Sequence, residues 1–386
     1  MPWRTMDIRE QRVSFVVAAC RGERSMSSLC AEFGISRPTG YLWLERYRAK
    51  GLSGIAERSR RPHHSPDRTA EKWEEQVIAL RRRYPDWGAR KLRVLLGRQQ
   101  IQLPATTIHR ILLRHDLVRA ADRHRPATKR FERSRPNELW QMDFKGPKNW
   151  PQPIGPLSVI DDHSRYVIAL AATGRLDGSL VQYHLQRAFE QCGLPEAMLM
   201  DHGTPWWNWQ SFSGRTHLSV WLMRQGIRLY WSGIQHPQTQ GKVERFHGSL
   251  QRALDQRTMK GEPQPWLDAY RQEHNHVRPH EALGMKTPAQ LWQPSPRLYK
   301  PCPPSWEYPP GAWTLKVDCQ GTIDIKDRRW RIGKTLAGER VWIQPIEQRY
   351  LVFYCNTLVR ELNPGMKRST IVERFIQTEK PSPNNV

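Results

Sequence analysis

The sequence is poor in the features that anchor a chain in a membrane or link it through disulfides. Its six cysteines show no paired spacing, so we expect free thiols in a reducing compartment and no zinc finger. No apolar run reaches the roughly 20 residues that span a bilayer, and there is neither a recognisable signal peptide nor a basic amphipathic anchor. These absences predict a soluble cytoplasmic protein that does not act at a membrane.

Acidic residues are scarce beside basic ones. The chain has 61 Lys and Arg against 37 Asp and Glu, which gives a formal net charge of +24. Without a membrane anchor, such an excess favours nucleic acid as the polyanionic partner. The sequence has no Walker motif, so nothing in it indicates ATP-dependent chemistry. With 386 residues, of which 38% are hydrophobic, the chain is long enough for about three or four modules with small cores.

The N-terminal residues have a pattern typical of a helix-turn-helix domain, which we expect over residues 1–57. Residues 27–33 predict a short helix, Gly34 a tight turn, and Ser36 the cap of a second helix. Side chains near the start of such a second helix are the first candidates to reach bases or phosphates. These candidates are Arg37, Thr39 and Tyr41. Gly40 weakens the pattern, because glycine is a poor helix former.

We expect a second helix-turn-helix or winged-helix-like domain over residues 66–120. Apolar residues recur there at helical spacing and should form its core: Val77, Leu80, Tyr84, Leu92, Leu95, Leu96, Ile108, Ile111, Leu112 and Leu113. A basic linker over residues 119–136 should follow phosphates and order when DNA is bound. The candidate DNA contacts in this part of the chain are Arg60, Arg61, Thr107, Arg110, Arg123, Arg125, Lys129 and Arg130.

Three carboxylates are candidate ligands in the next part of the chain. Asp143 lies inside an apolar strand, Asp201 ends another, and Glu244 lies in the first turn of an amphipathic helix that Thr239 can cap. A buried carboxylate is costly unless it is neutralised, and three cannot stay ionised together without metal. Such oxygen ligands suit Mg²⁺ or Mn²⁺. Glu244 also has Lys242 and Arg245 beside it, which is the setting of a solvated salt bridge.

Other residues could compete for a metal ion. Asp161 and Asp162 end a second strand and are rival ligands, but the neighbouring Arg165 favours a salt bridge that stabilises the turn. Three histidines further along could suggest a metal cluster, although buttressing of the helix that carries Glu244, or a contact with the DNA backbone, is the more ordinary role. They are His274, His276 and His280.

The three acids, with 57 and 42 residues between them, resemble the DDE triad of the retroviral-integrase superfamily. Four segments resemble the core signatures of that superfamily in bacterial insertion-sequence transposases: residues 140–144, 161–165, 201–203 and 240–245. The resemblance implies an α/β ribonuclease-H-like integrase catalytic core over residues 137–293. The sequence departs from it at His202, where asparagine is usual, and in a Trp-rich insert over residues 205–209.

The resemblance implies a multidomain transposase with helix-turn-helix modules, this core, and a C-terminal small β-barrel over residues 311–362, followed by a disordered tail over residues 363–386. It implies that the protein binds the terminal inverted repeats of its element, nicks the ends and transfers the 3′ hydroxyl to target DNA. Asp143, Asp201 and Glu244 would hold two Mg²⁺ or Mn²⁺ ions. A bacterial homodimer or higher oligomer, nucleoid-associated when bound to DNA, is the expected assembly.

Two other functions fit the sequence. One is an integrase-like DNA-binding regulator that has lost catalysis, which His202 leaves open although the intact triad argues against it. The other is a ribonuclease-H-like nuclease without strand transfer, against which the two DNA-binding modules and the C-terminal barrel argue. The candidate DNA contacts near the acids are Trp207, Trp209, Lys242 and Arg245. We expect one of the two tryptophans to stack on an unpaired base near the scissile phosphate, although packing on the core is the usual role of such rings.

Overall fold

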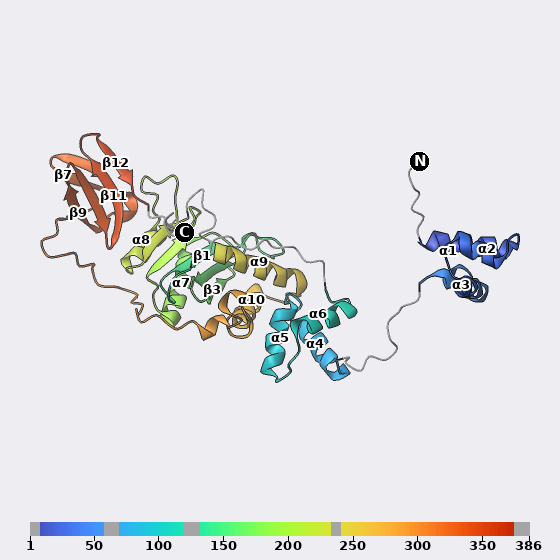
Figure 1. The fold of residues 1–386 in the computed structure, drawn as a ribbon. Coiled ribbons are helices and arrows are strands. Elements are labelled where there is room, and N and C mark those ends of the chain that lie inside the picture. The colour runs from blue at the N-terminus through green and yellow to red at the C-terminus, as the bar shows by residue number, and fades with distance from the viewer. Residues whose placement is uncertain (1–7, 58–68, 119–131, 233–240, 374–386) are drawn as a thin grey trace, which may run out of the picture. The chain divides into compact units, whose positions relative to one another are not determined.

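The computed structural model describes residues 8–57, 69–118, 132–232 and 241–373 (Figure 1). The chain forms two compact units, Met1–Thr69 and Ala70–Val386. None of the helices in these ranges is long and apolar enough to cross a membrane.

The first unit contains the expected helix-turn-helix. Its helices are α1 (Ile8–Arg21), α2 (Met26–Glu32) and α3 (Arg37–Lys50), followed by the short η1 (Gly51–Ile55). Ser36 caps α3, because its hydroxyl accepts a hydrogen bond from the backbone N–H of Thr39.

Gly40 supports the helix packing of the first unit, contrary to the expectation that it weakens the pattern. A Cβ at this position would lie 2.6 Å from Cys30 Sγ and 2.9 Å from the ring of Phe15. The absence of a side chain therefore lets α3 lie close against α1 and α2, which outweighs the poor helix propensity of glycine.

The second unit begins with three helices, α4 (Glu71–Arg83), α5 (Ala89–Arg98) and α6 (Ala105–Arg114). The apolar residues expected to form their core are buried, except Leu113, which is 52% exposed. Helical periodicity therefore identified this core with one residue misplaced.

A mixed five-stranded sheet forms the centre of the second unit. Its elements are β1 (Trp140–Phe144), β2 (Leu157–Asp161), β3 (Val167–Ala171), α7 (Gly178–Cys192), β4 (Ala197–Met200), α8 (His217–Arg224), β5 (Arg228–Trp231), α9 (Gly241–Gln256) and α10 (Pro263–Gln272). The strand order is β3-β2-β1-β4-β5, with β1, β2 and β3 antiparallel and β4 and β5 parallel to β1. This is the ribonuclease-H-like topology that the sequence predicted.

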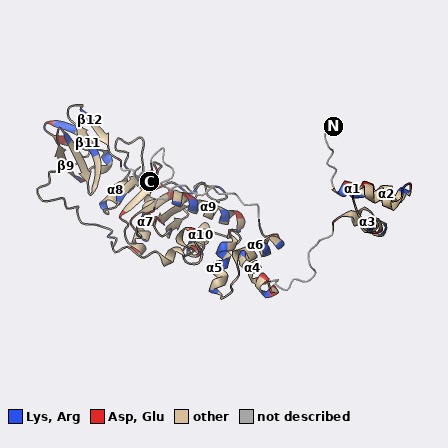
Figure 2. Cartoon of the chain, in the orientation of Figure 1, with Lys and Arg blue, Asp and Glu red and all other residues tan. Residues whose placement is uncertain are grey.

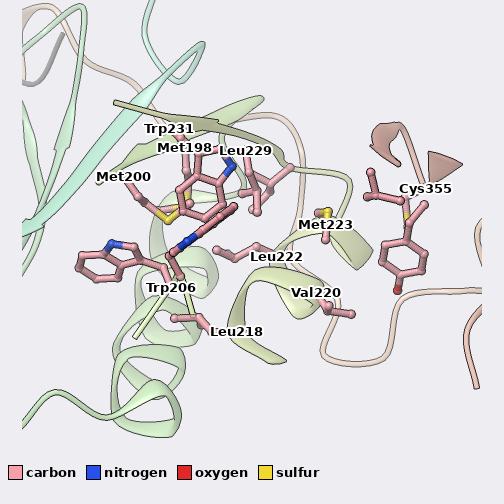
Figure 3. Packing of buried hydrophobic residues seen from close by; sticks show 14 of the residues in the cluster. Met198, Met200, Trp206, Leu218, Val220, Leu222, Met223, Leu229, Trp231 and Cys355 are labelled. Atoms are coloured by element: carbon pink, nitrogen blue, oxygen red, sulfur yellow. The ribbon is translucent and has the colours of Figure 1, made fainter. Parts of the chain in front are cut away.

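The two faces of the sheet have separate apolar cores. On one face, Trp140 and Met142 of β1 pack with α7 and α8 in a cluster that continues into the C-terminal strands. Figure 3 shows part of this cluster, including Met198 of β4 and Leu222 of α8. On the other face, α9 and α10 pack against β2 and β3 through Val243, Phe246 and Tyr270. Thr239, the expected cap of α9, lies outside the described residues.

The C-terminal strands do not close into the predicted barrel. They are β6 (Thr314–Lys316), β7 (Thr322–Ile325), β8 (Arg328–Arg331), β9 (Arg340–Ile346), β10 (Arg349–Tyr354), β11 (Thr357–Asn363) and β12 (Arg368–Ile371). Five of them form an open antiparallel sheet in the order β12-β11-β10-β9-β6, and β7 and β8 form a separate hairpin. Closure would require pairing of the edge strands β6 and β12, which have only three and four residues.

The predicted disordered tail over residues 363–386 also begins too early. β12 lies within it and pairs with β11, so the chain is ordered at least to that strand. Residues 374–386 lie outside the described part of the chain.

Candidate active site

Asp143 lies on the face of the sheet that α9 covers. Side chains alternate along β1, so Trp140 and Met142 pack on one face while Gln141 and Asp143 point to the other. Gln141 identifies that face, because its side-chain oxygen accepts a hydrogen bond from the backbone N–H of Val243 in α9 at 3.3 Å.

Asp201 follows β4, which is the parallel neighbour of β1. In that pairing Gln141 lies opposite Leu199, so the same register continued by two residues brings Asp201 level with Asp143. The carboxyl ends of the two parallel strands therefore present the two aspartates at one edge of the sheet.

Glu244 reaches the same region from α9. Its side chain is exposed in the first turn of the helix. Its neighbours Val243, Phe246 and Leu250 form the buried stripe that holds α9 on the sheet. The packing of the helix thus positions an exposed carboxylate beside the face that carries Asp143.

The electrostatics of Asp143 reflect this arrangement. Burial first, then the charge of Asp201 and then that of Glu244, raise the pKa of the Asp143 carboxyl to about 7, although Phe144 donates its backbone N–H to Oδ1 at 2.8 Å. His247 lies 3.8 Å away, Nδ1 to Oδ2, but burial lowers its pKa to about 3, so the ring is neutral. Among the described residues, no Lys or Arg forms an ion pair with Asp143.

Asp143 meets the negative charges of Asp201 and Glu244 and has no Lys or Arg partner among the described residues, a setting that a divalent cation would stabilise. Within the described ranges, however, no three His, Cys, Asp or Glu side chains are arranged closely enough to hold a metal ion. Because ligands of like charge repel one another in the absence of a cation, this spacing is compatible with the donor set.

Asp161 and Asp162 are not rivals for a metal, because protein donors occupy them. Asp161 accepts hydrogen bonds from the backbone N–H of Asn137 at 2.7 Å and from the hydroxyl of Ser164 at 2.6 Å. Asp162 pairs with the ammonium group of Lys242 at 2.5 Å and accepts from Gln141 Nε2 at 2.8 Å. Both acids are fully buried.

The expected salt-bridge partner of these two acids was therefore wrong. Arg165 pairs with Glu132 at 3.4 Å, whereas Lys242, 80 residues along the chain from Asp162, provides the cation. Burial lowers the pKa of Lys242 to about 8, with Asp162 opposing the shift. Lys242 thus ties α9 to the end of β2. We had expected Lys242 to contact DNA, but its ammonium group is buried in this ion pair.

The residues predicted to contact DNA differ in how exposed their side chains are. The side chains of Arg37, Tyr41, Arg110 and Arg245 are exposed, while Thr39 and Thr107 are half-buried. The remaining basic candidates, Arg60, Arg61, Arg123, Arg125, Lys129 and Arg130, lie outside the described residues.

The two tryptophans expected to meet DNA also differ. Trp207 is only 3% exposed and packs against Trp231 at a centroid distance of 4.9 Å, so it belongs to the core and cannot stack on a base. Trp209 is 67% exposed. Its indole N–H donates to the backbone oxygen of His202 at 2.9 Å.

Of the three candidate histidines, His274 contacts α9, whereas His276 is exposed with its ring against Tyr166 and His280 packs on His274. They lie in and after the short π-helical turn η3 (Glu273–Val277), and His274 is buried with its ring 5.0 Å from that of Phe246 in α9. His274 Nε2 also lies 3.3 Å from the backbone oxygen of Arg165. The buttressing role that the sequence suggested matches these contacts.

Three residues near the acids escaped the sequence analysis. His247 follows Glu244 by three residues, a helical spacing that could have revealed it. Trp206 donates its indole N–H to Asp201 Oδ1 at 2.6 Å, and Glu373 pairs with His202 at 3.0 Å between Oε2 and Nε2. No local pattern could have revealed a contact that spans 171 residues of sequence.

Models of known protein families match four stretches of the chain. Two models described as integrase core domains match residues 133–237 and 225–288, which contain the central sheet and the three acids. A helix-turn-helix domain model matches residues 11–63, and a homeodomain-like domain model matches residues 39–112.

Known proteins that resemble the chain come from mobile elements. An uncharacterized 31.7 kDa protein of insertion element IS407 from Burkholderia multivorans is 24% identical over 254 residues, which cover 63% of this chain and 89% of that protein. An uncharacterized 39.2 kDa protein of insertion element IS476 from Xanthomonas euvesicatoria is 25% identical over 258 residues, covering 64% and 72%. The transposase for transposon Tn552 from Staphylococcus aureus is 24% identical over 288 residues, covering 61% and 54%.

Among solved structures, the HTLV-2 integrase catalytic core domain in complex with magnesium matches 42% of this chain and 99% of its own, with 15% identity and a TM-score of 0.32. At that TM-score the likeness carries no argument. The chain thus resembles integrase core domains, helix-turn-helix domains and proteins of insertion elements, in agreement with the insertion-sequence transposase of the integrase superfamily that the sequence predicted.

Proposed function

We propose that this protein is a DDE transposase that binds the terminal inverted repeats of its own element and catalyses metal-dependent strand cleavage and strand transfer. One observation carries the proposal. Asp143 lies level with Asp201 at the adjoining ends of β1 and β4, and burial first, then the charges of Asp201 and Glu244, raise the pKa of its carboxyl group to about 7. A fold that gathers acids without a cation of its own is suited to bind one from solution.

Asp143, Asp201 and Glu244 would hold two Mg²⁺ or Mn²⁺ ions, which when bound neutralise charge on the attacking and leaving oxygens. The remaining work falls to the protein itself. The sheet fixes the two aspartates, α9 fixes Glu244, and basic side chains hold the phosphate backbone. Arg245, exposed beside Glu244, is the nearest candidate for that contact.

DNA recognition is assigned to the helix-turn-helix domains. Arg37 and Tyr41 are exposed at the start of α3, and Arg110 is exposed on α6. Lys and Arg occur in helices of both units and in the strands of the second (Figure 2). Such a distribution suits a protein that contacts terminal-repeat DNA and target DNA through several modules, as a homodimer or higher oligomer.

The experiment compares Asp143→Asn, Asp201→Asn and Glu244→Gln with the wild type on DNA that carries an element end. Each variant removes one charged ligand and keeps a side chain of similar shape. Because metal-based charge stabilisation is worth several kcal/mol, we expect cleavage with Mg²⁺ to fall by about 10³-fold or more. Binding to the end DNA in a gel-shift assay should stay within about two-fold.

The control is Asp324→Asn, which changes an exposed acid of the C-terminal hairpin that pairs with Arg329. It should cleave like the wild type. Cleavage by any triad variant at the rate of the control would remove that residue from the site. A wild type that binds the ends but cleaves with neither Mg²⁺ nor Mn²⁺ would instead be the regulator, and one that cleaves without joining strands would be the nuclease.

A further inference from the structure

Trp206 contacts both aspartate-bearing segments of the candidate site. Its indole N–H donates to Asp201 Oδ1 at 2.6 Å. Its ring stacks on that of Phe144, the residue after Asp143, with centroids 5.4 Å apart and ring planes 13° from parallel. One side chain therefore joins the end of β1 to the loop that follows β4.

The neighbouring tryptophans show that this is more than core packing. Trp206 belongs to the same buried cluster as Trp207 and Trp231, and Figure 3 shows Trp206 in it with Trp231. The indole nitrogens of Trp207 and Trp231 are buried without a hydrogen-bond partner, so this cluster tolerates an unpaired indole. Of these three, only Trp206 directs its N–H at a carboxylate, and that carboxylate is a candidate ligand.

The hydrogen bonds on Asp201 have a directional effect. Among the described residues, two donors bond to Asp201: the indole N–H of Trp206 and the backbone N–H of Gly203, the latter at 2.9 Å. Both of these hydrogen bonds are accepted by Oδ1. A carboxylate held at one oxygen by two donors has a fixed orientation, with Oδ2 left for another ligand. Hydrogen bonds of this kind orient metal ligands in proteins.

Trp206 is itself held firmly. It is 1% exposed, and its backbone oxygen accepts a hydrogen bond from the hydroxyl of Thr216 at 3.4 Å. Thr216 is the N-cap of α8, and the adjacent Arg215 donates to the backbone oxygen of Val372 at 3.0 Å. The indole therefore has little freedom to turn away from Asp201.

We propose that Trp206 is a positioning residue of the metal site, which fixes the carboxylate of Asp201 relative to Asp143. The indole N–H sets the orientation of Asp201, and the stack on Phe144 sets the separation of the two segments. This inference rests on the proposed function, because it takes Asp143 and Asp201 to be metal ligands.

The test is metal binding by the full-length protein without DNA, measured by isothermal titration with Mn²⁺ and by the rise in melting temperature with Mg²⁺. Trp206→Phe keeps an aromatic ring and removes the N–H. We expect about 10- to 100-fold weaker metal affinity, the usual effect of losing a hydrogen bond to a ligand. Cleavage should fall at low metal concentration and recover as the metal concentration is raised.

Trp207→Phe is the matched control, because it makes the same change in a neighbouring buried indole whose N–H has no partner. It should bind metal within about two-fold of the wild type. Equal metal affinity of Trp206→Phe and wild type would overturn the inference, and so would equal losses in the two variants. If Trp206→Phe does not fold, Phe144→Leu replaces it, since it removes the stack and keeps the N–H. Its metal affinity should then fall, and an unchanged affinity would also overturn the inference.

Asp143→Asn distinguishes failure of this inference from failure of the proposed function. If Asp143→Asn binds metal like the wild type, the proposed function fails. If Asp143→Asn loses metal while Trp206→Phe does not, the triad stands and the role of Trp206 is wrong.

Discussion

Two groups of acids in the central sheet have opposite electrostatic surroundings. Asp161 and Asp162, at the end of β2, are fully buried and meet donors on several sides, including the ammonium group of Lys242. Asp143, on β1, lies three residues along from Trp140, the register partner of Asp161. It meets the charges of Asp201 and Glu244 instead.

The difference separates structural acids from candidate ligands. A buried carboxylate with its own cation and donors is satisfied, and another ligand would have to displace them. A carboxylate whose neighbours are other carboxylates gains most from an added cation. Position in a strand, which the two groups share, does not distinguish them, whereas the charge of their partners does.

The largest effect on the free energy of unfolding is expected at the buried ion pair of Asp162 and Lys242. It tests whether Asp162 is a structural acid. Asp162→Asn leaves the buried ammonium group of Lys242 without its counter-charge, which in similar cases costs about 3–5 kcal/mol. We expect a loss of this size in the free energy of unfolding from urea titrations at pH 7. The folded protein should still bind Mn²⁺, since Asp162 is not a ligand.

The double variant Asp162→Asn with Lys242→Met serves as its control. It removes both charges, so most of the lost stability should return. If the single variant costs less than about 1 kcal/mol, Asp162 is not a structural acid of the kind described. Loss of Mn²⁺ binding by the folded single variant would also place it in the metal site.

A smaller effect on stability is expected from His280, which packs on His274 next to α9. Burial first, then the charge of Arg278, lower the pKa of His280 to about 3, with Lys91, Arg165 and His274 also facing it. In the unfolded chain its pKa is near 6.5, so between pH 6.5 and about 3 the unfolded state binds the additional proton. The contribution of His280 to stability is thus fully present above pH 6.5 and is lost as the pH falls.

The expected slope is up to about 1.4 kcal/mol per pH unit for each such histidine. Between pH 6.5 and 5, His280 should therefore account for about 2 kcal/mol of the lost stability. His280→Asn should show a loss smaller by that amount in urea unfolding at the two pH values. Identical slopes in the variant and the wild type would mean that His280 is not held neutral.

Short-range patterns in the sequence predicted the fold well. Short apolar runs and helical spacing located the strands and the helix that carry the three acids, because each pattern depends on residues only a few positions apart. The same information placed Asp143 inside a strand, Asp201 at the end of another and Glu244 in the first turn of a helix. It could not identify the partner of Asp162, because Lys242 becomes its neighbour only when α9 packs across the sheet.

For the same reason, the sequence did not show which of Trp207 and Trp209 packs on the core and which is exposed. Trp207 and Trp209 both follow the glycine turn after Asp201, so their positions in the sequence do not distinguish them. Arg215 covers Trp207, with its guanidinium 5.7 Å from the Trp207 ring, and Arg215 is held by the backbone of Val372. The closed barrel was over-predicted because strand spacing does not reveal whether the edge strands β6 and β12 are long enough to meet.

The smallest effect is expected on the cleavage rate and concerns Trp209, which belongs to the loop that follows Asp201, one of the candidate ligands. The Trp209 ring is 67% exposed and so available to a ligand, and its indole N–H donates to the backbone oxygen of His202, the residue after Asp201, at 2.9 Å. We expect Trp209 to stack on an unpaired base near the scissile phosphate, a contact worth at least about 1 kcal/mol. Trp209→Ala should then slow cleavage of fully paired ends by roughly five-fold or more and cleavage of pre-frayed ends much less. Its melting temperature should hardly change, because substitutions of exposed side chains usually cost less than about 0.5 kcal/mol.

Trp306→Ala, at another partly exposed tryptophan remote in sequence from the acids, should leave both rates unchanged. Equal losses on paired and frayed ends, or a marked drop in melting temperature, would assign Trp209 to the packing of the loop and not to DNA.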